Sequence, residues 1–446
     1  MKTPIIDFLE EYKVINATRL HMPGHKGKGF LGVEGLDITE ISGADELYAS
    51  SGIIKESREC ASRLFGSGAS FYATEGSSQC VRAMLYLALT YLKTIGKEPV
   101  LLAARNAHKS FVGACALLGI EPIWLYGKDD GLLSCNITEE CLDEALSREG
   151  GRVSAVYLTS PDYLGNTLPI DKLSKIAKKH GALLLVDNAH GAYRAFLSEN
   201  SHPMAQGADM CCDSAHKTLP ALTGAAYLHI SKAAPKMLAE RAEEALAVFG
   251  TTSPSYLIMA SLDGVNSYVE NGYRERLAAF SERVFEMKKR LMVAGYELVG
   301  DECLKISIAT KSYGYLGDEL ARELLSEKLV VEFFDRDFVV MMLSPEMQVE
   351  ETDRLMSVLL SIKRREAITE EPPRSPHGKK RMPPRDAMLA PSEEISVSEA
   401  RGRVLASVSV SCPPAVPIAV YGEEITEEAV SLFRYYGIET CRVVKE

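Results

Sequence analysis

Between residues 98 and 230 the sequence alternates short apolar runs with segments of helical periodicity. The runs are PVLLAA (99–104), PIWLY (122–126), VSAVYLTS (153–160), ALLLVD (182–187) and GAAYLHI (224–230). The intervening segments 108–119, 137–149 and 170–181 repeat apolar residues at helical spacing. Strands that are apolar throughout are buried on both faces of a sheet. The pattern therefore predicts an α/β fold with a mostly parallel sheet covered by helices on both sides.

The length of the chain allows more than one domain. With 446 residues and 46% hydrophobic content, we expect two or three. Residues 367–391 contain six prolines and many charges, which is typical of a linker. The predicted parts are an N-terminal segment (1–50), a large domain (51–255), a small α/β domain (256–366), this linker and a C-terminal domain (392–446).

Composition excludes several classes of protein. A net charge of −11 argues against a general nucleic-acid binder, which needs a basic face. The ten cysteines form no CxxC pair, so we expect a reducing, cytoplasmic compartment. The N-terminus carries acids instead of an apolar signal core, and no apolar run reaches membrane-spanning length. His21 and His25 are separated by Pro23 and Gly24, which disfavours a helical metal site. We predict no metal and no membrane association.

A carboxylate and a lysine follow two neighbouring predicted strands. The run ALLLVD ends at Asp187, and Lys217 lies among small and apolar residues in DSAHKTLPALTG (213–224). Desolvation in such a setting lowers the pKa of a lysine and makes it a nucleophile toward carbonyls, although most single lysines are solvated surface residues. Pyridoxal phosphate needs this pair, because the lysine forms a Schiff base and the acid keeps the pyridine nitrogen protonated. We therefore predict pyridoxal phosphate as the cofactor.

The start of a long predicted helix offers a place for the phosphate. Gly76, Ser77 and Ser78 precede apolar residues at helical spacing, and free N–H groups at a helix N-terminus attract anions. The same Gly-Ser-Ser sequence also serves as an ordinary helix cap. The sequence therefore leaves two interpretations of this stretch: a phosphate-binding site or an ordinary helix cap.

Taken together, the motifs resemble the Orn/Lys/Arg decarboxylases of pyridoxal-phosphate fold type I. They occur in family order between about residues 17 and 430, and the set resembles the shorter, biosynthetic-type branch that includes bacterial arginine decarboxylases. The matching stretches are HMPGHKGKGF, DITEISGADELY, ATEGSSQC, RNAHKS, VDNAHGAY, DSAHKTLPALTG, TTSPSYLIMASLD, PPRDAMLAP and PPAVPIAVYGEEIT.

The resemblance implies a role for each matching residue. Lys217 would carry the cofactor, Asp187 would pair with the pyridine nitrogen, Ala189 would pack near the ring and His108 would stack on it. Gly76, Ser77, Ser78, Ser214 and His216 would hold the phosphate. Thr252 would reach the phosphate of a neighbouring subunit, which implies a homodimer or larger homo-oligomer with shared active sites. Lys217 or His216 would return a proton to the substrate carbon.

Two positions depart from the family pattern. Glu75 stands where Asn is usual, and Tyr421 replaces the proline before Gly422. The second departure bears on Glu423, which the resemblance implies as the residue that binds the substrate's distal cation. The implied reaction converts arginine, lysine or ornithine into an amine and CO2 for polyamine biosynthesis, and the short branch favours arginine.

Two alternatives remain open at this point. The same fold supports aminotransferases and other pyridoxal-phosphate lyases. An aminotransferase usually needs an arginine for the substrate α-carboxylate, and no arginine is clearly placed for it. A catalytically silent scaffold or regulatory protein is the alternative of another class. The presence of Lys217, Asp187 and His108 argues against it.

Overall fold

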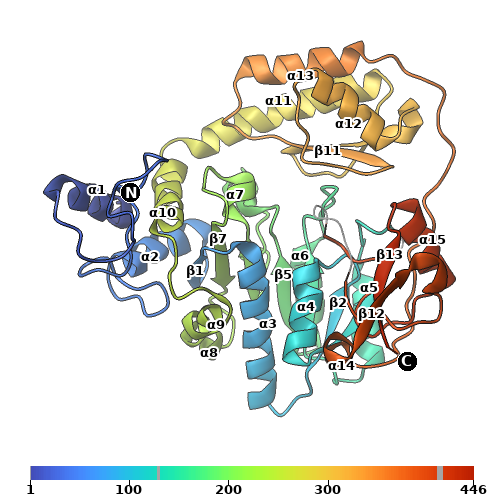
Figure 1. Ribbon diagram of the computed structural model, residues 1–446, viewed down its shortest axis with the longest axis horizontal. Helices are drawn as coiled ribbons and strands as arrows, with labels where there is room; N and C mark the ends of the chain where they lie inside the picture. Colours follow the sequence, from blue (N-terminus) through green and yellow to red (C-terminus); the bar gives the residue numbers. More distant parts are fainter. Residues whose placement is uncertain (1, 128–130, 409–414, 446) are drawn as a thin grey trace. The chain divides into compact units, whose positions relative to one another are not determined.

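The computed structural model describes residues 2–127, 131–408 and 415–445, and its largest sheet has seven strands (Figure 1). The strands are β1 (Ala69–Ala73), β2 (Val100–Ala104), β3 (Glu121–Leu125), β4 (Ala155–Thr159), β5 (Leu183–Asp187), β6 (Met210–Asp213) and β7 (Ala226–Ile230). They lie in the order β1-β7-β6-β5-β4-β2-β3. The pairs β6–β5, β5–β4 and β2–β3 are parallel, and β7 is antiparallel to both neighbours. The predicted α/β fold with a mostly parallel sheet is confirmed.

The buried strands explain why the apolar runs were continuous. Every residue of β2, β5, β6 and β7 is buried. A strand covered on both faces cannot alternate apolar with polar residues. Helix α3 (Gly76–Thr94) contacts β1, β7, β6 and β5, and it buries ten of its side chains, most of them apolar.

The chain forms two compact units, each assembled from separate stretches. The first unit comprises residues 1–99, 143–160 and 169–275. Besides α3, its helices are α1 (Pro4–Ile15), α2 (Ile53–Phe65), α6 (Ile170–Lys179), α7 (Ala215–Thr218), α8 (Lys236–Glu240), α9 (Ala242–Phe249) and α10 (Tyr256–Glu270), with a 3-10 turn η1 (Ala192–Phe196). None of the helices within the described ranges is long and apolar enough to cross a membrane.

The second unit comprises residues 100–142, 161–168 and 276–446. It contains an antiparallel sheet in the order β10-β11-β9-β8 and a two-stranded sheet of β12 and β13. Their bounds are β8 (Glu297–Val299), β9 (Lys305–Ala309), β10 (Phe333–Phe334), β11 (Phe338–Met342), β12 (Ser392–Ser396) and β13 (Thr440–Val444). Its helices are α4 (Lys109–Leu118), α12 (Gly317–Ser326), α13 (Val349–Ser361), α14 (Pro384–Leu389) and α15 (Glu427–Tyr435). It also contains the short 3-10 turns η2 (Thr310–Tyr313) and η3 (Val397–Glu399). Helices α5 (Glu139–Arg148) and α11 (Tyr273–Val293) contribute residues to both units.

Two local features differ from the sequence pattern. The apolar stretch VVEFF (330–334) forms only the two-residue strand β10, and Val330 is 85% exposed. The proline-rich stretch contains α14, whose Ala387 is buried and which packs against α4. Proline is tolerated in the first turn of a helix, because the N–H group it lacks has no partner within the helix there. Proline content alone therefore did not reveal this helix.

A buried carboxylate on α10 holds the N-terminus of α1. Helices α1, α2 and α10 pack together, and Asp263 is fully buried among them. Its Oδ2 accepts hydrogen bonds from the backbone N–H groups of Ile5 (2.9 Å) and Ile6 (3.1 Å). Helix N-terminal N–H groups have no partner within their own helix and favour a negative charge. Asp263 therefore fixes α1 to the body of the first unit.

We predict that Asp263→Ala releases α1 while the rest of the first unit stays folded. Losing this acceptor leaves two N–H groups unsatisfied, which costs about 1–3 kcal/mol. Amide hydrogen exchange within residues 4–15 should become about ten- to a hundredfold faster, measured by mass spectrometry. Asp143→Asn removes a carboxylate whose partners are Lys179 and His180, outside α1, and serves as the control. Equal exchange in α1 of both variants would contradict the anchoring role.

Candidate active site

The candidate site lies where two parallel strands of the first unit end. Strands β5 and β6 are paired so that Asp187 aligns with Cys212. The chain then continues from β6 through Ser214 into the short helix α7, which carries His216 and Lys217. Carboxyl ends of neighbouring parallel strands are the usual ligand-binding edge of such sheets. The predicted acid and lysine therefore follow adjacent strands of one unit.

Asp187 is buried and held in a fixed orientation. Tyr157 donates its hydroxyl to Oδ2 at 2.9 Å. The Ala189 N–H (3.1 Å) and the Cys212 thiol (3.6 Å) donate to Oδ1. Buried carboxylates need such partners because desolvation is costly. The hydrogen bonds from Tyr157 and Cys212 to Asp187 were not predicted from the sequence, since neither residue stands in a motif.

Lys217 contacts a histidine from the loop after β5. Its Nζ lies 3.0 Å from Nε2 of His190, a residue that is 6% exposed. The other histidine beside the lysine, His216, donates its Nδ1–H to the carbonyl oxygen of Ala225 at 2.9 Å. This bond fixes the tautomer of His216, because a carbonyl can only accept. His190 stands in the motif VDNAHGAY directly after β5, where the sequence alone allows either a residue that lines the pocket or one that the turn needs, and the structure brings it to the lysine.

The N-terminus of α3 forms a partly exposed cradle with two hydroxyl groups. The Ser214 hydroxyl donates to the Ser77 hydroxyl at 2.8 Å, which joins the α7 turn to α3. Gly76 has a φ of 72°, and its N–H donates to the Gly224 carbonyl at 2.8 Å. A Cβ atom on Gly224 would lie 2.7 Å from the Thr74 carbonyl oxygen, so only glycine fits. Backbone N–H groups, hydroxyls and a positive helix end suit a phosphate.

Glu75, at the position where asparagine is usual, has a hydrogen-bond partner on a distant loop. Glu75 is exposed immediately before α3, and its Oε1 accepts a hydrogen bond from the Thr251 N–H at 2.6 Å. Glu75 therefore holds the loop that carries Thr252. Thr252 is itself exposed.

Two predicted residues belong to the second unit. His108 caps α4, where its Nδ1 accepts a hydrogen bond from the Ser110 N–H at 3.1 Å. Glu423 is 4% exposed, accepts from the Val420 N–H at 3.0 Å and lies 3.8 Å from the Arg105 guanidinium. Arg105 also donates to the carbonyls of Pro417 and Ile418, both at 2.8 Å. Glu423 is therefore engaged within its own unit.

A buried polar network lies directly behind the lysine turn. Asp213, fully buried, accepts from His202 Nε2 at 2.9 Å and from the Asn188 amide at 2.6 Å, and it lies 3.2 Å from His229. Burial would raise the pKa of Asp213, but the two histidines outweigh it and hold that pKa well below its usual range. Burial in turn lowers the pKa of His229.

The hydrogen bonds of Asp213 connect the end of β5 to the end of β6. Asn188 directly follows Asp187, and Asp213 lies four residues before Lys217. His202 and His229 come from outside the motifs, so no sequence signal marked them. His202, Cys211 and Asp213 also bring one ligand-type atom each within 4.8 Å of one another. The hydrogen bonds of Asp213 account for this cluster.

These features fit pyridoxal phosphate and define the class of protein. The first unit offers a lysine for the cofactor aldehyde, a buried carboxylate for the pyridine nitrogen and a helix N-terminus with hydroxyls for the phosphate. Among solved structures, lysine decarboxylase A from Pseudomonas aeruginosa matches with a TM-score of 0.81 at 18% identity, covering 99% of this chain and 80% of that one. Lysine decarboxylase from Francisella novicida matches at 0.80 and 17%, with coverages of 99% and 81%. The chain therefore has the fold type I architecture of these enzymes, and its first unit fits pyridoxal phosphate.

Sequence comparison gives the family. The model of the Orn/Lys/Arg decarboxylase major domain matches residues 3–313, and that of the family's C-terminal domain matches residues 374–441. Arginine decarboxylase from Bacillus subtilis is 29% identical over 96% of this chain and 92% of its own. Arginine decarboxylase from Halalkalibacterium halodurans is 28% identical, with coverages of 97% and 93%. The chain belongs to the Orn/Lys/Arg decarboxylase family and is an amino-acid decarboxylase that uses pyridoxal phosphate.

We predict that Asp213→Asn lowers the free energy of unfolding by about 3–5 kcal/mol at pH 7, because it removes one partner of a buried charged network. Denaturant-induced unfolding measures the change. Asp143→Asn is the control, since Asp143 pairs with Lys179 and His180 at the surface and such pairs contribute about 1 kcal/mol or less.

The effect of Asp213→Asn should also depend on pH. A carboxyl whose pKa is depressed by folding contributes stability above its unfolded pKa of about 4, and that contribution is lost as the pH falls toward its folded pKa. The difference between the wild-type protein and Asp213→Asn should therefore shrink between pH 7 and pH 3. A difference that stays constant over this range would show that Asp213 is not the charged member of the network.

Proposed function

We propose that this protein decarboxylates arginine to agmatine and CO2 and supplies polyamine biosynthesis in the cytoplasm. The observation that carries the proposal is the joint position of Lys217, Asp187 and the α3 cradle in one unit. Arginine is favoured over lysine and ornithine because the arginine decarboxylases of Bacillus subtilis and Halalkalibacterium halodurans match over nearly their whole length. The lysine decarboxylase structures match at 17–18% identity and support only the fold.

The chain's own residues position the reactants and move protons. When bound, the cofactor accepts the electron pair that the departing carboxylate leaves behind. Asp187 holds the pyridine nitrogen protonated, and Tyr157 keeps that carboxylate in place. The amine of Lys217 lies 3.0 Å from His190 Nε2 and can exchange a proton with this histidine. The same amine can then give a proton to the substrate carbon. His190 therefore joins His216 and Lys217 in the proposed proton transfer.

The remaining roles complete the proposed site. His108 would stack on the cofactor ring and Ala189 would pack near it. Ser78 would add its N–H group to the phosphate cradle of Gly76, Ser77, Ser214 and His216. Thr252, exposed on the loop that Glu75 holds, contacts the phosphate in a second copy of the chain. The working form is then a homodimer or a larger homo-oligomer, and Glu423 binds the distal cation of the substrate.

The deciding experiment incubates the purified protein with pyridoxal phosphate and separately with arginine, lysine and ornithine. We expect agmatine from arginine, identified by mass, and much slower turnover of the other two. Lys217→Ala should lose the visible absorbance of the bound cofactor and at least about a thousandfold in rate, since it removes a group on which the reaction depends. Lys232→Ala, an exposed lysine, is the control. A keto acid product would instead favour the aminotransferase alternative, and absence of turnover with all three substrates would contradict the proposal.

The role of Glu423 has its own test. Glu423→Gln keeps an oxygen for the Val420 N–H but removes the charge, so KM for arginine should rise at least about tenfold with little change in kcat. Glu424→Gln removes only a surface pair with Arg381 and is the matched control. If Glu423→Gln lowers the unfolding temperature and leaves KM unchanged, its carboxylate serves Arg105 and not the substrate.

A further inference from the structure

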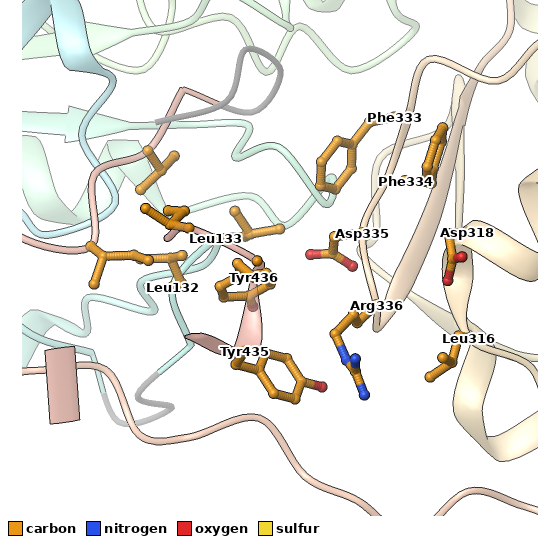
Figure 2. A pocket seen from close by; sticks show the side chains of 14 residues that line it. Leu132, Leu133, Leu316, Asp318, Phe333, Phe334, Asp335, Arg336, Tyr435 and Tyr436 are labelled. Carbon is orange, nitrogen blue, oxygen red and sulfur yellow. The ribbon is translucent and has the colours of Figure 1, made fainter. Parts of the chain in front are cut away.

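The second unit contains a cavity of about 460 Å³ that none of the proposed cofactor residues lines (Figure 2). Its walls come from the segment before α5, the start of α12, the β10–β11 turn and the end of α15. The lining residues are Leu132, Leu133, Leu316, Asp318, Phe333, Phe334, Asp335, Arg336, Val416, Ile418, Tyr435, Tyr436, Gly437 and Ile438. A volume of this size is typical of small-molecule sites.

Most of the cavity wall is apolar and well supported. Leu133, Phe333 and Val416 are each less than a tenth exposed, and they pack with Leu164 and Val340 in one hydrophobic cluster. Such a wall favours the methylene groups of a ligand, because water leaves apolar surface on both sides. It provides shape but no charge.

All but one of the charged groups at the cavity have a counter-charge. Asp318 pairs with Arg322 at 2.9 Å. Arg336 pairs with Glu370 at 2.8 Å and lies over the Tyr435 ring. Behind the cavity, Asp337 pairs with Lys311 at 2.7 Å and accepts the Tyr435 hydroxyl at 2.6 Å.

Asp335 is the exception. Its Oδ1 accepts the backbone N–H groups of Asp337 and Phe338, both at 2.7 Å. Across the described part of the chain, no cationic side chain lies within ion-pair distance of its carboxylate. Figure 2 shows this carboxylate between Phe333, Tyr436 and Arg336. Burial raises the pKa of Asp335 to about 6, although both backbone hydrogen bonds oppose the rise. A half-buried charge without a counter-charge is unfavourable, and a bound cation would relieve it.

We propose that this cavity binds an aliphatic amine, with its ammonium group on Asp335 and its methylene stem against Leu133 and Phe333. An anion would face Asp335, and a neutral apolar molecule would leave its charge unpaired. Ca²⁺ or Mg²⁺ would need several oxygen ligands, which this wall does not supply. Amines are also the product class of the proposed decarboxylation, and the identification of the ligand as a product rests on that proposed function. The cavity then gives the enzyme a second site that senses its product.

The test measures, by calorimetry, binding of agmatine, the product of the proposed reaction, and of cadaverine, a diamine that has a simple neutral isostere, to the full chain loaded with pyridoxal phosphate. The absorbance of the cofactor is recorded in parallel, because an amine that reaches the cofactor changes that absorbance and one in the cavity does not. We expect one binding event that leaves the spectrum unchanged. Asp335→Asn keeps the acceptor for the two N–H groups and should weaken this event at least tenfold. The neutral isostere 1,5-pentanediol should not bind.

Two further variants make the result specific. Asp353→Asn removes an exposed carboxylate outside the cavity, and its binding should equal that of the wild-type protein. Leu132→Trp adds volume to the cavity wall, leaves the Asp335 carboxylate in place and should abolish binding, which covers the case in which Asp335→Asn does not fold. Unchanged affinity in Asp335→Asn or Leu132→Trp, or equal binding of the diol, would overturn the inference.

The result of the cavity-binding test can be distinguished from the result of the test for decarboxylation. If the enzyme forms no amine from any basic amino acid but Asp335-dependent cadaverine binding is found, the site stands and only its role as a product sensor fails. If agmatine is formed and no such binding occurs, the cavity inference alone is wrong.

Discussion

The parallel pairing of β5 with β6 is the constraint on which the candidate site depends. It aligns Asp187 with Cys212, and the Asn188 N–H bonds to the Cys212 carbonyl at 3.0 Å just beyond the paired residues. Because the register is fixed there, the acid at the end of β5 and the lysine turn after β6 cannot move independently. A shift of one residue would reverse the faces on which these side chains lie.

The fully buried Asp213 and the half-buried Asp335 have different surroundings for their negative charge. Asp213 has two histidines and an amide around it, so its charge is compensated and its pKa is depressed. Asp335 accepts two backbone N–H groups and forms no ion pair within the described residues, and burial raises its pKa to about 6 although the charge of Lys311 opposes the rise. The first arrangement stabilises the native state by itself. The second costs stability when ionised, and a cation bound in the proposed cavity site would offset that cost.

The sequence predicted the features that are local and missed those that depend on distant partners. Continuous apolar runs predicted the sheet, and the ordered motifs predicted Lys217, Asp187 and the family. His229, by contrast, contacts Asp213 and Ser70, and the second of these lies 159 residues away. Glu75 finds its partner, Thr251, 176 residues further on. No periodicity or spacing encodes such pairs, because only the tertiary fold brings them together.

The two proposed amine sites would respond to different forms of the same molecule. An aliphatic amine has a pKa near that of a lysine side chain, about 10.4, so at neutral pH nearly all of it is the ammonium form. That form suits Asp335 directly, whereas reaction at the cofactor aldehyde needs the neutral amine. Binding in the cavity therefore does not require the amine to lose its proton, whereas reaction with the cofactor does.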